Sequence, residues 1–286
     1  MTSTAPTTTL ARYLGQKLLE PLHLVTYMCD EPNEAMAGIG FDDGQYWPLY
    51  FAGRAAPLGQ VPAAVVDAIF YNFAPGMAEE FYTGVWDVTT PSAALAAREA
   101  GSVAGLRRVL GPLADSPAIA RAADLALRLA LNAPSEGRPL YAGLRTIAVP
   151  TEPLARLWHA ATLLREHRGD GHNAALVAAG INGQEAHVFA ALDTGMTPRA
   201  YGRLDPLSDA ELEAVVDGLR DRGLVDADGE FTVAGRELKD RIEEQTDLAA
   251  APAYSSLTAD ELAQFTADLE PLAAHIEAVG YDYRVA

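Results

Sequence analysis

The sequence predicts a mainly α-helical protein made of two similar halves, residues 10–150 and 151–286, with a small β-hairpin in the second half. Three observations predict this fold class. Apolar residues recur at the three- and four-residue spacing of amphipathic helices. Four short blocks of the first half return in the same order in the second half. Two β-rich pieces, 224–225 and 231–233, flank Asp228-Gly229, which is a strong signal for a tight hairpin turn.

The evidence for a duplication is the order of the matching blocks. EPLHLVTY at 20–27 resembles EPLARLWH at 152–159. Three further pairs follow in the same order, 56–70 with 179–192, 91–111 with 207–226, and 130–144 with 247–257. Each pair alone is weak evidence, because alanine-rich helices resemble one another. Their preserved order indicates that one ancestral unit was repeated.

The second half divides into helices at caps and glycine stops. Gly169-Asp170-Gly171 is expected to stop a helix as a turn, and Gly180 to end the next one. Ser208, with Glu211 three residues on, has the spacing of a capping box. These signals predict helices over 153–168, 172–180, 182–195 and 208–223, another that opens at 234–235, and a mostly helical tail over 250–286.

The hairpin region resembles a known family. LRDRGLV before the hairpin and FTVAGREL after it are similar to LxxRGLV and LTxAGRxL of MarR-type winged-helix regulators. YFAGRAAPLG (50–59), FYNFAP (70–75) and LLREHRGDGH (163–172) also resemble a bacterial subfamily of paired helix-turn-helix proteins. The resemblance implies two winged-helix-like halves in one chain, a pseudo-dimer, with the hairpin as a wing. It also implies a ligand pocket at the junction of the halves.

Composition limits the function classes. With 286 residues, 49% of them hydrophobic, the chain can bury a sizeable core. Cys29 is the only cysteine, which excludes an internal disulfide and a multi-cysteine zinc site. No apolar run is long enough to span a membrane, and no secretory signal precedes the first helix, so we expect a cytoplasmic protein without a membrane partner.

The charge disfavours strong DNA binding. The formal net charge is −18, and a chain this acidic repels a polyanion unless one face is basic. By resemblance 208–223 is the recognition helix, yet Ser208, Asp209 and Glu211 stand at the end that would enter the groove. The expected wing, DADGE at 226–230, is acidic as well.

One candidate site is the polar segment LLREHRGDGH and the helix before it. His159 and His167 lie eight residues apart, too far to share a metal ion directly. Three interpretations stay open: a metal site completed by Glu166 or Asp170, a helix end in which Asp170 caps the following helix, and a ligand clamp of arginines and imidazoles. Under the last interpretation the candidate ligand-binding residues are His159, Arg165, His167, Arg168, Asp170 and His172.

The other candidate site is an aromatic cluster in the first half. Aromatic residues at helical spacing usually form core, but they also wall ligand pockets that have a few polar anchors. If the halves face one another, this cluster meets the histidine segment at the junction. The candidate residues are His23, Tyr27, Tyr46, Trp47, Tyr50, Arg54 and Asn72.

The first functional hypothesis is a small-molecule-binding protein that senses, carries or sequesters an aromatic or anionic metabolite at the junction of the halves. The alternatives are a ligand-responsive DNA-binding regulator of the MarR type and an enzyme that uses the His/Arg/Asp cluster. No metalloprotease, phosphate-loop, nucleotide-binding or serine-hydrolase motif is present, so the catalytic residues of such an enzyme are unknown, and no cofactor or bound metal is expected. The oligomeric state is open.

Overall fold

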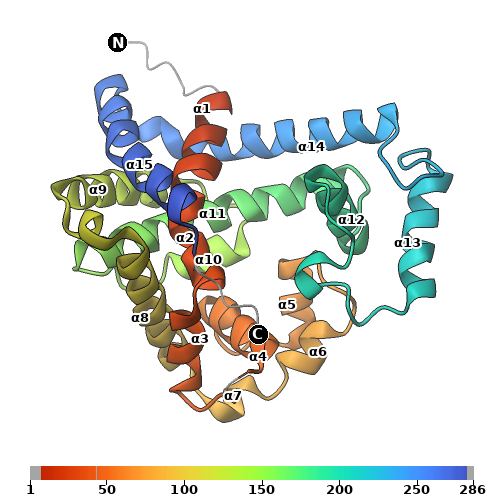
Figure 1. The fold of residues 1–286 in the computed structure, drawn as a ribbon, viewed down its shortest axis with the longest axis horizontal. Coiled ribbons are helices and arrows are strands. Elements are labelled where there is room, and N and C mark those ends of the chain that lie inside the picture. The colour runs from red at the N-terminus through yellow and green to blue at the C-terminus, as the bar shows by residue number, and fades with distance from the viewer. Residues whose placement is uncertain (1–7, 43, 282–286) are drawn as a thin grey trace. The chain divides into compact units, whose positions relative to one another are not determined.

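The computed structural model describes residues 8–42 and 44–281, and most of these residues are helical (Figure 1). The prediction of a mainly α-helical protein is confirmed. No residue in these two ranges belongs to a β-strand. The expected hairpin is reduced to one antiparallel bridge between Val225 and Phe231. A β-hairpin wing is therefore not confirmed, because helix α14 (Val233–Ala250) begins two residues after the bridge and leaves no room for a strand.

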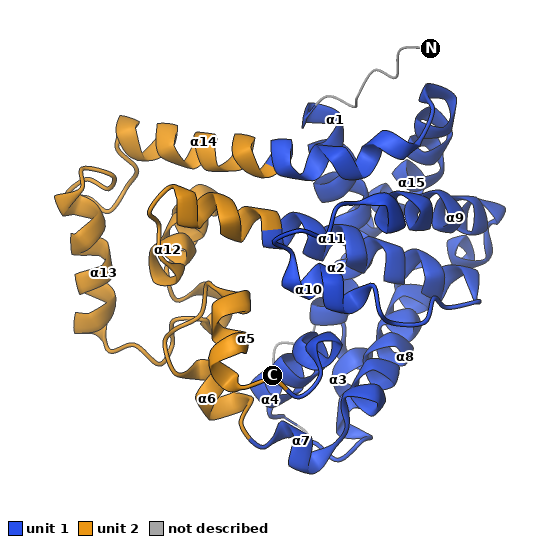
Figure 2. Ribbon diagram, turned by 180° about the vertical axis from the view of Figure 1, so that it is seen from behind, with its two compact units in different colours: residues 1–60, 84–170, 247–286 blue, residues 61–83, 171–246 orange. Residues whose placement is uncertain are grey.

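The chain forms two compact units (Figure 2). Unit 1 comprises Met1–Gln60, Gly84–Asp170 and Asp247–Ala286, and unit 2 comprises Val61–Thr83 and Gly171–Thr246. Each unit contains segments from both expected halves. Compactness does not test ancestry, so the division into halves at residue 150 stays a prediction.

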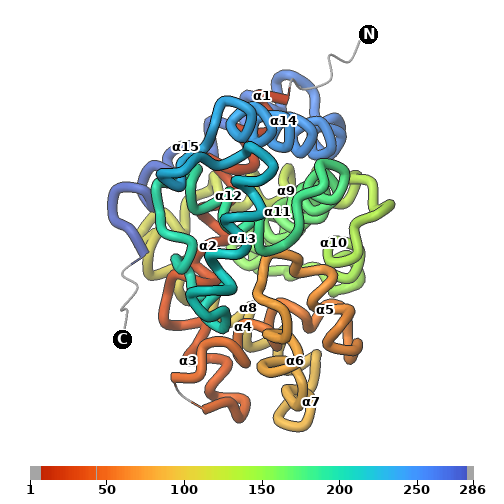
Figure 3. Tube along the Cα trace, turned by 90° about the vertical axis from the view of Figure 1, so that its right-hand side faces the viewer, coloured from red at the N-terminus to blue at the C-terminus, as the bar shows by residue number. Residues whose placement is uncertain are grey.

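Unit 1 contains most of the helices. Segments from near both chain ends meet here, since the π-helical segment Tyr13–Leu19 packs against α15 (Figure 3). Helix α11 (Pro153–Ala178) contributes its residues up to Asp170. The other helices of the unit are α1 (Thr8–Arg12), α2 (Glu20–Met28), α3 (Asp30–Ala37), α4 (Tyr46–Ala55), α7 (Val85–Val88), α8 (Pro91–Leu110), α9 (Pro117–Asn132), α10 (Pro139–Leu144) and α15 (Ala259–Val279), with 3₁₀ segments Ala56–Leu58, Gly111–Asp115 and Ala251–Ser256.

Small residues on α8 let it approach its neighbour closely. A Cβ on Gly101 would lie 2.5 Å from the Cα of Pro32, and one on Gly105 would lie 3.1 Å from the Cβ of Cys29. Helix α8 therefore packs along α3 almost backbone to backbone. Thr90 caps the start of α8 by accepting a hydrogen bond from the Ala93 N–H at 3.2 Å. These contacts fix the helix that carries Arg98.

Helix α11 is continuous, so the predicted turn at Gly169-Asp170-Gly171 is wrong. Glycine permits a turn but does not force one, and it costs a helix only about 1 kcal/mol relative to alanine. A Cβ on Gly169 would make ordinary contact, 3.6 Å from the Glu166 carboxylate. Asp170 does not cap a following helix either. Its carboxylate accepts the Tyr141 N–H at 3.0 Å, which satisfies a free donor at the start of α10.

Unit 2 is smaller and contains α5 (Ala63–Phe70), α6 (Met77–Phe81), α12 (Gly183–Thr194), α13 (Asp209–Asp221), the 3₁₀ segment Ala200–Gly202, the end of α11 and the start of α14. The predicted helices over 182–195 and 208–223 are confirmed as α12 and α13. Ser208 and Glu211 form the expected capping box, and Asn182 and Glu185 form another. Gly180 follows the end of α11 at φ +67°, as predicted for a glycine stop.

Candidate functional site

Unit 1 contains a cavity of about 610 Å³. This volume lies within the usual range of small-molecule sites. Its walls come from α8, from the turn after α10, from α11 and from the segment 56–59. Most lining residues are apolar or small. They are Ala56, Pro57, Gly59, Ser92, Leu95, Ala96, Arg98, Glu99, Ala100, Leu144, Thr146, Ile147, Ala148, Trp158, His159 and Thr162.

Arg98 is a buried cation at the cavity wall, with 5% of its surface exposed. It donates one hydrogen bond to the Tyr27 hydroxyl at 3.2 Å. Its guanidinium carbon lies over the Trp158 ring, 5.5 Å from the ring centre. Within the described ranges, no carboxylate forms an ion pair with Arg98. A buried charge without an opposite charge is costly, so this arginine is a strong candidate for contact with a ligand.

His159 borders the same cavity and is 97% buried. Burial and then the positive charge of Arg98 lower the pKa of His159 to about 4, so the ring is neutral near pH 7. A neutral imidazole has one N–H donor and one acceptor nitrogen. In the described part of the chain neither nitrogen makes a hydrogen bond, so both are available to a bound molecule.

A chain of hydrogen bonds holds the inner wall in place. The Thr162 hydroxyl donates to the Trp158 carbonyl at 2.9 Å, so its oxygen accepts the Nδ1–H of His23 at 2.9 Å. The Trp158 indole N–H donates to the Thr26 hydroxyl at 2.9 Å. Burial and then the charge of Arg165 lower the pKa of His23 well below its usual value. The His23 ring is therefore neutral and has a structural role. Its Nε2 is buried and has no hydrogen-bond partner within the described residues.

Next to this wall is a buried charge cluster. The Glu166 carboxylate pairs with Arg165 at 2.8 Å and with Arg54 at 3.1 Å. Burial would raise the pKa of Glu166, but the two guanidinium groups lower it to about 2. Arg54 also donates to the Tyr50 hydroxyl at 2.8 Å, and Arg165 lies over the Tyr27 ring. Glu166 stays ionised and holds both arginines.

The structure brings together several residues that the sequence analysis selected from both halves. Arg165 from the second half lies over the Tyr27 ring of the first half and shares the Glu166 carboxylate with Arg54 of the first half. The Tyr27 ring centre lies 5.4 Å from that of His23 and 5.3 Å from that of Tyr50. Tyr46 and Trp47 extend this aromatic group, since their ring centres lie 5.8 and 5.7 Å from that of Tyr50.

Of the predicted site residues, His159 alone is among the residues that line the cavity, so the aromatic group with Arg54 and Arg165 lies beside the cavity, and Arg168, His167 and Asp170 lie apart from it. Arg168 pairs with Asp247 at 3.1 Å. The His167 ring packs edge-on against Tyr141, with 5.0 Å between ring centres. Burial and then Arg138 lower the pKa of His167 to about 3, whereas burial raises the pKa of Asp170 to about 6. His167 and Asp170 therefore have structural contacts that hold α10 against α11.

Two predicted site residues belong to unit 2. Asn72 follows α5, and its backbone N–H donates to the Phe70 carbonyl at 2.8 Å. The His172 Nδ1 lies 2.9 Å from the Thr246 hydroxyl. Neither residue lines the cavity of unit 1.

The sequence analysis did not select Arg98 or Glu166 as ligand-binding residues. A signal for Arg98 was present. It lies four residues after Ala94 and three before Gly101, on the face of α8 that carries small residues. A helix face of small residues usually packs against a neighbouring helix, so an arginine on that face is expected to be buried. A buried arginine in turn needs a polar or charged partner.

The described residues contain no group of three or more His, Cys, Asp or Glu side chains arranged to hold a metal ion. Among these same residues, no helix is both long and apolar enough to cross a membrane.

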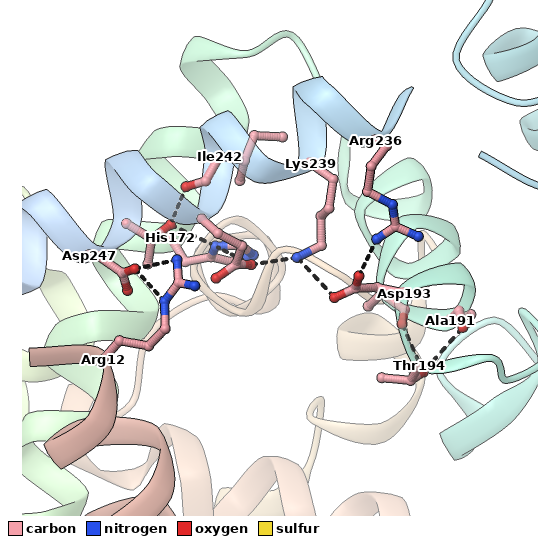
Figure 4. Close-up of polar contacts among 12 residues, drawn as sticks. Arg12, His172, Ala191, Asp193, Thr194, Arg236, Lys239, Ile242 and Asp247 are labelled. Atoms are coloured by element: carbon pink, nitrogen blue, oxygen red, sulfur yellow. Dashed lines mark hydrogen bonds and ion pairs between the residues drawn. The ribbon is translucent and has the colours of Figure 1, made fainter. Parts of the chain in front are cut away.

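In unit 2, consecutive helices α12 and α13 contact each other. The arginine of α13 and the one at its C-terminal cap form ion pairs within the protein. Arg220 pairs with Glu213 and Asp217, and Arg222 pairs with Glu185 at 2.9 Å. Near the C-terminal end of α12, Asp193 forms ion pairs with Arg236 at 2.6 Å and with Lys239 at 3.4 Å, both from α14 (Figure 4). The outward residues of α13 are mainly acidic.

The chain belongs to a helix-turn-helix family, whose sequence profile matches residues 11–281. Membership of the MarR type specifically is not confirmed. No curated protein and no solved structure gives a significant match to the chain.

Proposed function

We propose that this helix-turn-helix protein binds a small molecule in the unit 1 cavity and that it senses, carries or sequesters that molecule. The observation that carries the proposal is a cavity of about 610 Å³ bordered by buried Arg98, which forms no ion pair with a carboxylate of the described chain. The neutral ring of His159 adds unused hydrogen-bonding groups at the same wall. Apolar walls with a few polar anchors are typical of ligand pockets.

The origin of the lining residues supports a pocket at the junction of the two expected halves. Arg98 and Leu144 belong to the first half of the sequence, whereas Trp158, His159 and Thr162 belong to the second. All of them lie within unit 1, so the proposal does not depend on the placement of unit 2.

A neutral fluorescent probe tests the proposal. We expect N-phenyl-1-naphthylamine to bind saturably to the wild-type protein, with enhanced fluorescence. Ala96 lines the cavity and is exposed on α8, so Ala96→Trp should block it without disturbing the core. Ala104→Trp is the matched control, because Ala104 is exposed on the same helix and does not line the cavity.

The outcome is decided by the two tryptophan variants. Loss of probe binding in Ala96→Trp but not in Ala104→Trp supports the cavity as the site. Equal binding by both variants, or no saturable binding by the wild type, contradicts the proposal.

A second candidate function is DNA-binding regulation, and the family match favours it. The charges of α13 oppose it. Its first turn carries Asp209 and Glu211, and its one arginine, Arg220, is already paired with carboxylates. Base-reading helices need free Arg, Lys, Asn or Gln side chains, so we rank this function second.

A further inference from the structure

We propose that the molecule in the cavity is a monocarboxylate with an apolar body and that Arg98 pairs with its carboxylate. This inference rests on the ligand-binding function proposed above and names the chemical class of the ligand. It is argued from the charge balance around Arg98, from the donors that remain at the cavity wall, and from the character of the other lining residues.

The charge balance identifies Arg98 as the cation that lacks an anion. The buried carboxylate of the cluster, Glu166, already pairs with Arg54 and Arg165, and it feels the charge of Arg98 without forming an ion pair with it. Glu20 also pairs with Arg165, at 3.4 Å. The cluster therefore neutralises its own arginines and leaves Arg98 with ring contacts and one hydroxyl. A bound anion would supply the missing charge.

The position of Arg98 is fixed before a ligand binds. Its hydrogen bond to Tyr27 and its contact with the Trp158 ring hold the guanidinium, and Trp158 is itself held by Thr26. A guanidinium has five N–H donors in a rigid fork that matches a planar carboxylate. Because the described chain uses one hydrogen bond from this group, enough donors remain for a two-point contact with a carboxylate.

The other polar groups at the cavity favour one negative charge over two. Arg98 is the only cationic residue among the lining residues. His159 is neutral and offers a hydrogen bond without adding charge. Glu99 also lines the cavity, and an anion close to it is disfavoured. A phosphate monoester or a dicarboxylate would bring a second negative charge that the described lining does not balance.

The rest of the lining suits an apolar body. Leu95, Leu144 and Ile147, together with alanines and a proline, form most of the remaining wall. Burial of apolar ligand surface against such residues contributes roughly 25 cal/mol per Å². The chemical class is therefore an amphipathic monoanion whose charged end meets Arg98 and whose body occupies the apolar part of the cavity.

Matched neutral and charged probes test the inference. 1-Naphthoate and 1-naphthamide share an apolar body and differ in charge. We expect 1-naphthoate to displace N-phenyl-1-naphthylamine from the wild-type protein at a concentration at least ten-fold lower than 1-naphthamide does. This ratio follows from the strength of charge-assisted hydrogen bonds. Thermal shift with each compound alone provides an independent readout.

Two arginine variants locate the effect. Arg98→Gln should abolish the preference for 1-naphthoate while binding of the neutral probe persists, and Arg98→Lys should keep part of the preference. Arg107→Gln is the control, because Arg107 is half exposed on the same helix and pairs with Asp115. Glu99→Gln should strengthen 1-naphthoate binding, since it removes a negative charge from the lining.

The two proposals fail in different ways. Equal affinity of the wild type for 1-naphthoate and 1-naphthamide overturns the carboxylate inference while probe binding still supports the cavity. No binding of the probe and no thermal shift with either compound overturns both. If Arg98→Gln is unfolded by circular dichroism, the wild-type ratio and Arg98→Lys decide the question.

Discussion

Glu166 is the residue on which the buried charges of unit 1 depend. Its side chain is 3% exposed and neutralises two guanidinium groups that are themselves largely buried. Removal of one partner from a buried ion pair leaves an uncompensated charge, which typically costs about 3–5 kcal/mol. The neighbouring tyrosines also depend on it, because Arg54 and Arg165 hold Tyr50 and Tyr27.

We therefore expect Glu166→Gln to lower the free energy of unfolding by about 3 kcal/mol or more. Urea unfolding followed by circular dichroism measures the change. Asp115→Asn is the control, since Asp115 is 79% exposed in its pair with Arg107 and should have little effect. Equal stability of the two variants would show that the cluster is not a buried charge network.

His159 predicts a dependence of stability on pH. Its pKa is about 4 in the folded protein, against 6.5 for the ordinary side chain. Below pH 6.5 the unfolded chain takes up a proton that the folded protein does not, so stability falls as the pH falls toward 4. Glu166 acts in the same direction but at lower pH, between 4.5 and about 2.

The stability lost between pH 7 and pH 5 should thus be smaller in His159→Gln than in the wild type, by about 2 kcal/mol. Urea titrations at both pH values measure this difference. Asp170 works in the opposite direction, because its raised pKa of about 6 favours the folded protein as the pH falls. It is present in both proteins and cancels in the comparison. An unchanged pH dependence would mean that His159 is not buried as a neutral ring.

At the scale of elements, helix packing depends on where small residues lie. Helix α8 approaches α3 closely because Gly101 and Gly105 face it. Glycine elsewhere in a helix has no such role. A Cβ atom added to Gly218 on α13 would have no other atom within 4 Å. The same residue type therefore has opposite effects at the two positions.

Gly101→Ala should destabilise the protein by about 1–3 kcal/mol, because the new methyl group would lie 2.5 Å from Pro32. Gly218→Ala should stabilise it by about 0.5–1 kcal/mol, since alanine favours a helix and meets no neighbour. Chemical denaturation of both variants gives the two values. Stabilisation by Gly101→Ala would contradict the close contact of α8 with α3, whereas destabilisation by Gly218→Ala would contradict only the open space around Gly218.

Gly169→Ala tests the continuity of α11. Alanine is favoured in a helix interior and would make only ordinary contact here, so we expect stabilisation of about 0.5–1 kcal/mol. A turn that requires a left-handed glycine would instead be destabilised by the same substitution. Thermal denaturation distinguishes the two outcomes.

At the scale of the whole molecule, family membership and charge point to different functions. The chain belongs to a helix-turn-helix family, yet its net charge is −18. Arg220 of α13 and Arg222 at its C-terminal cap pair with the protein's own carboxylates. Phosphate contacts by basic residues supply most non-specific DNA affinity, and this helix offers few.

In a gel-shift assay at 50 mM salt we expect no retention of sheared bacterial DNA at micromolar protein. Low salt favours any electrostatic binding, so this condition is the most permissive one. Retention that weakens steeply as salt is added would instead support the regulator function. Ligand binding in the cavity is measured separately and does not depend on this result.

The sequence by itself determined the local features of this protein. Capping boxes at Ser208 and Asn182, the glycine stop at Gly180 and the helices α12 and α13 follow from contacts within a few residues. The mainly helical class was predictable for the same reason, and the acidic net charge follows from the composition alone. The bridge between Val225 and Phe231 shows the limit, since strands need partners along their length.

The tertiary structure alone decided which polar residues are buried together. Arg54 and Glu166 are far apart in the chain, and no local pattern indicates that they form an ion pair. Gly169 lies inside α11 because contacts made around it, such as Asp170 to Tyr141, outweigh its preference for turns. Likewise, the cavity beside Arg98 exists only where α8 and α11 meet. Burial and pairing depend on contacts across the fold, and these set both the charge states and the candidate ligand site.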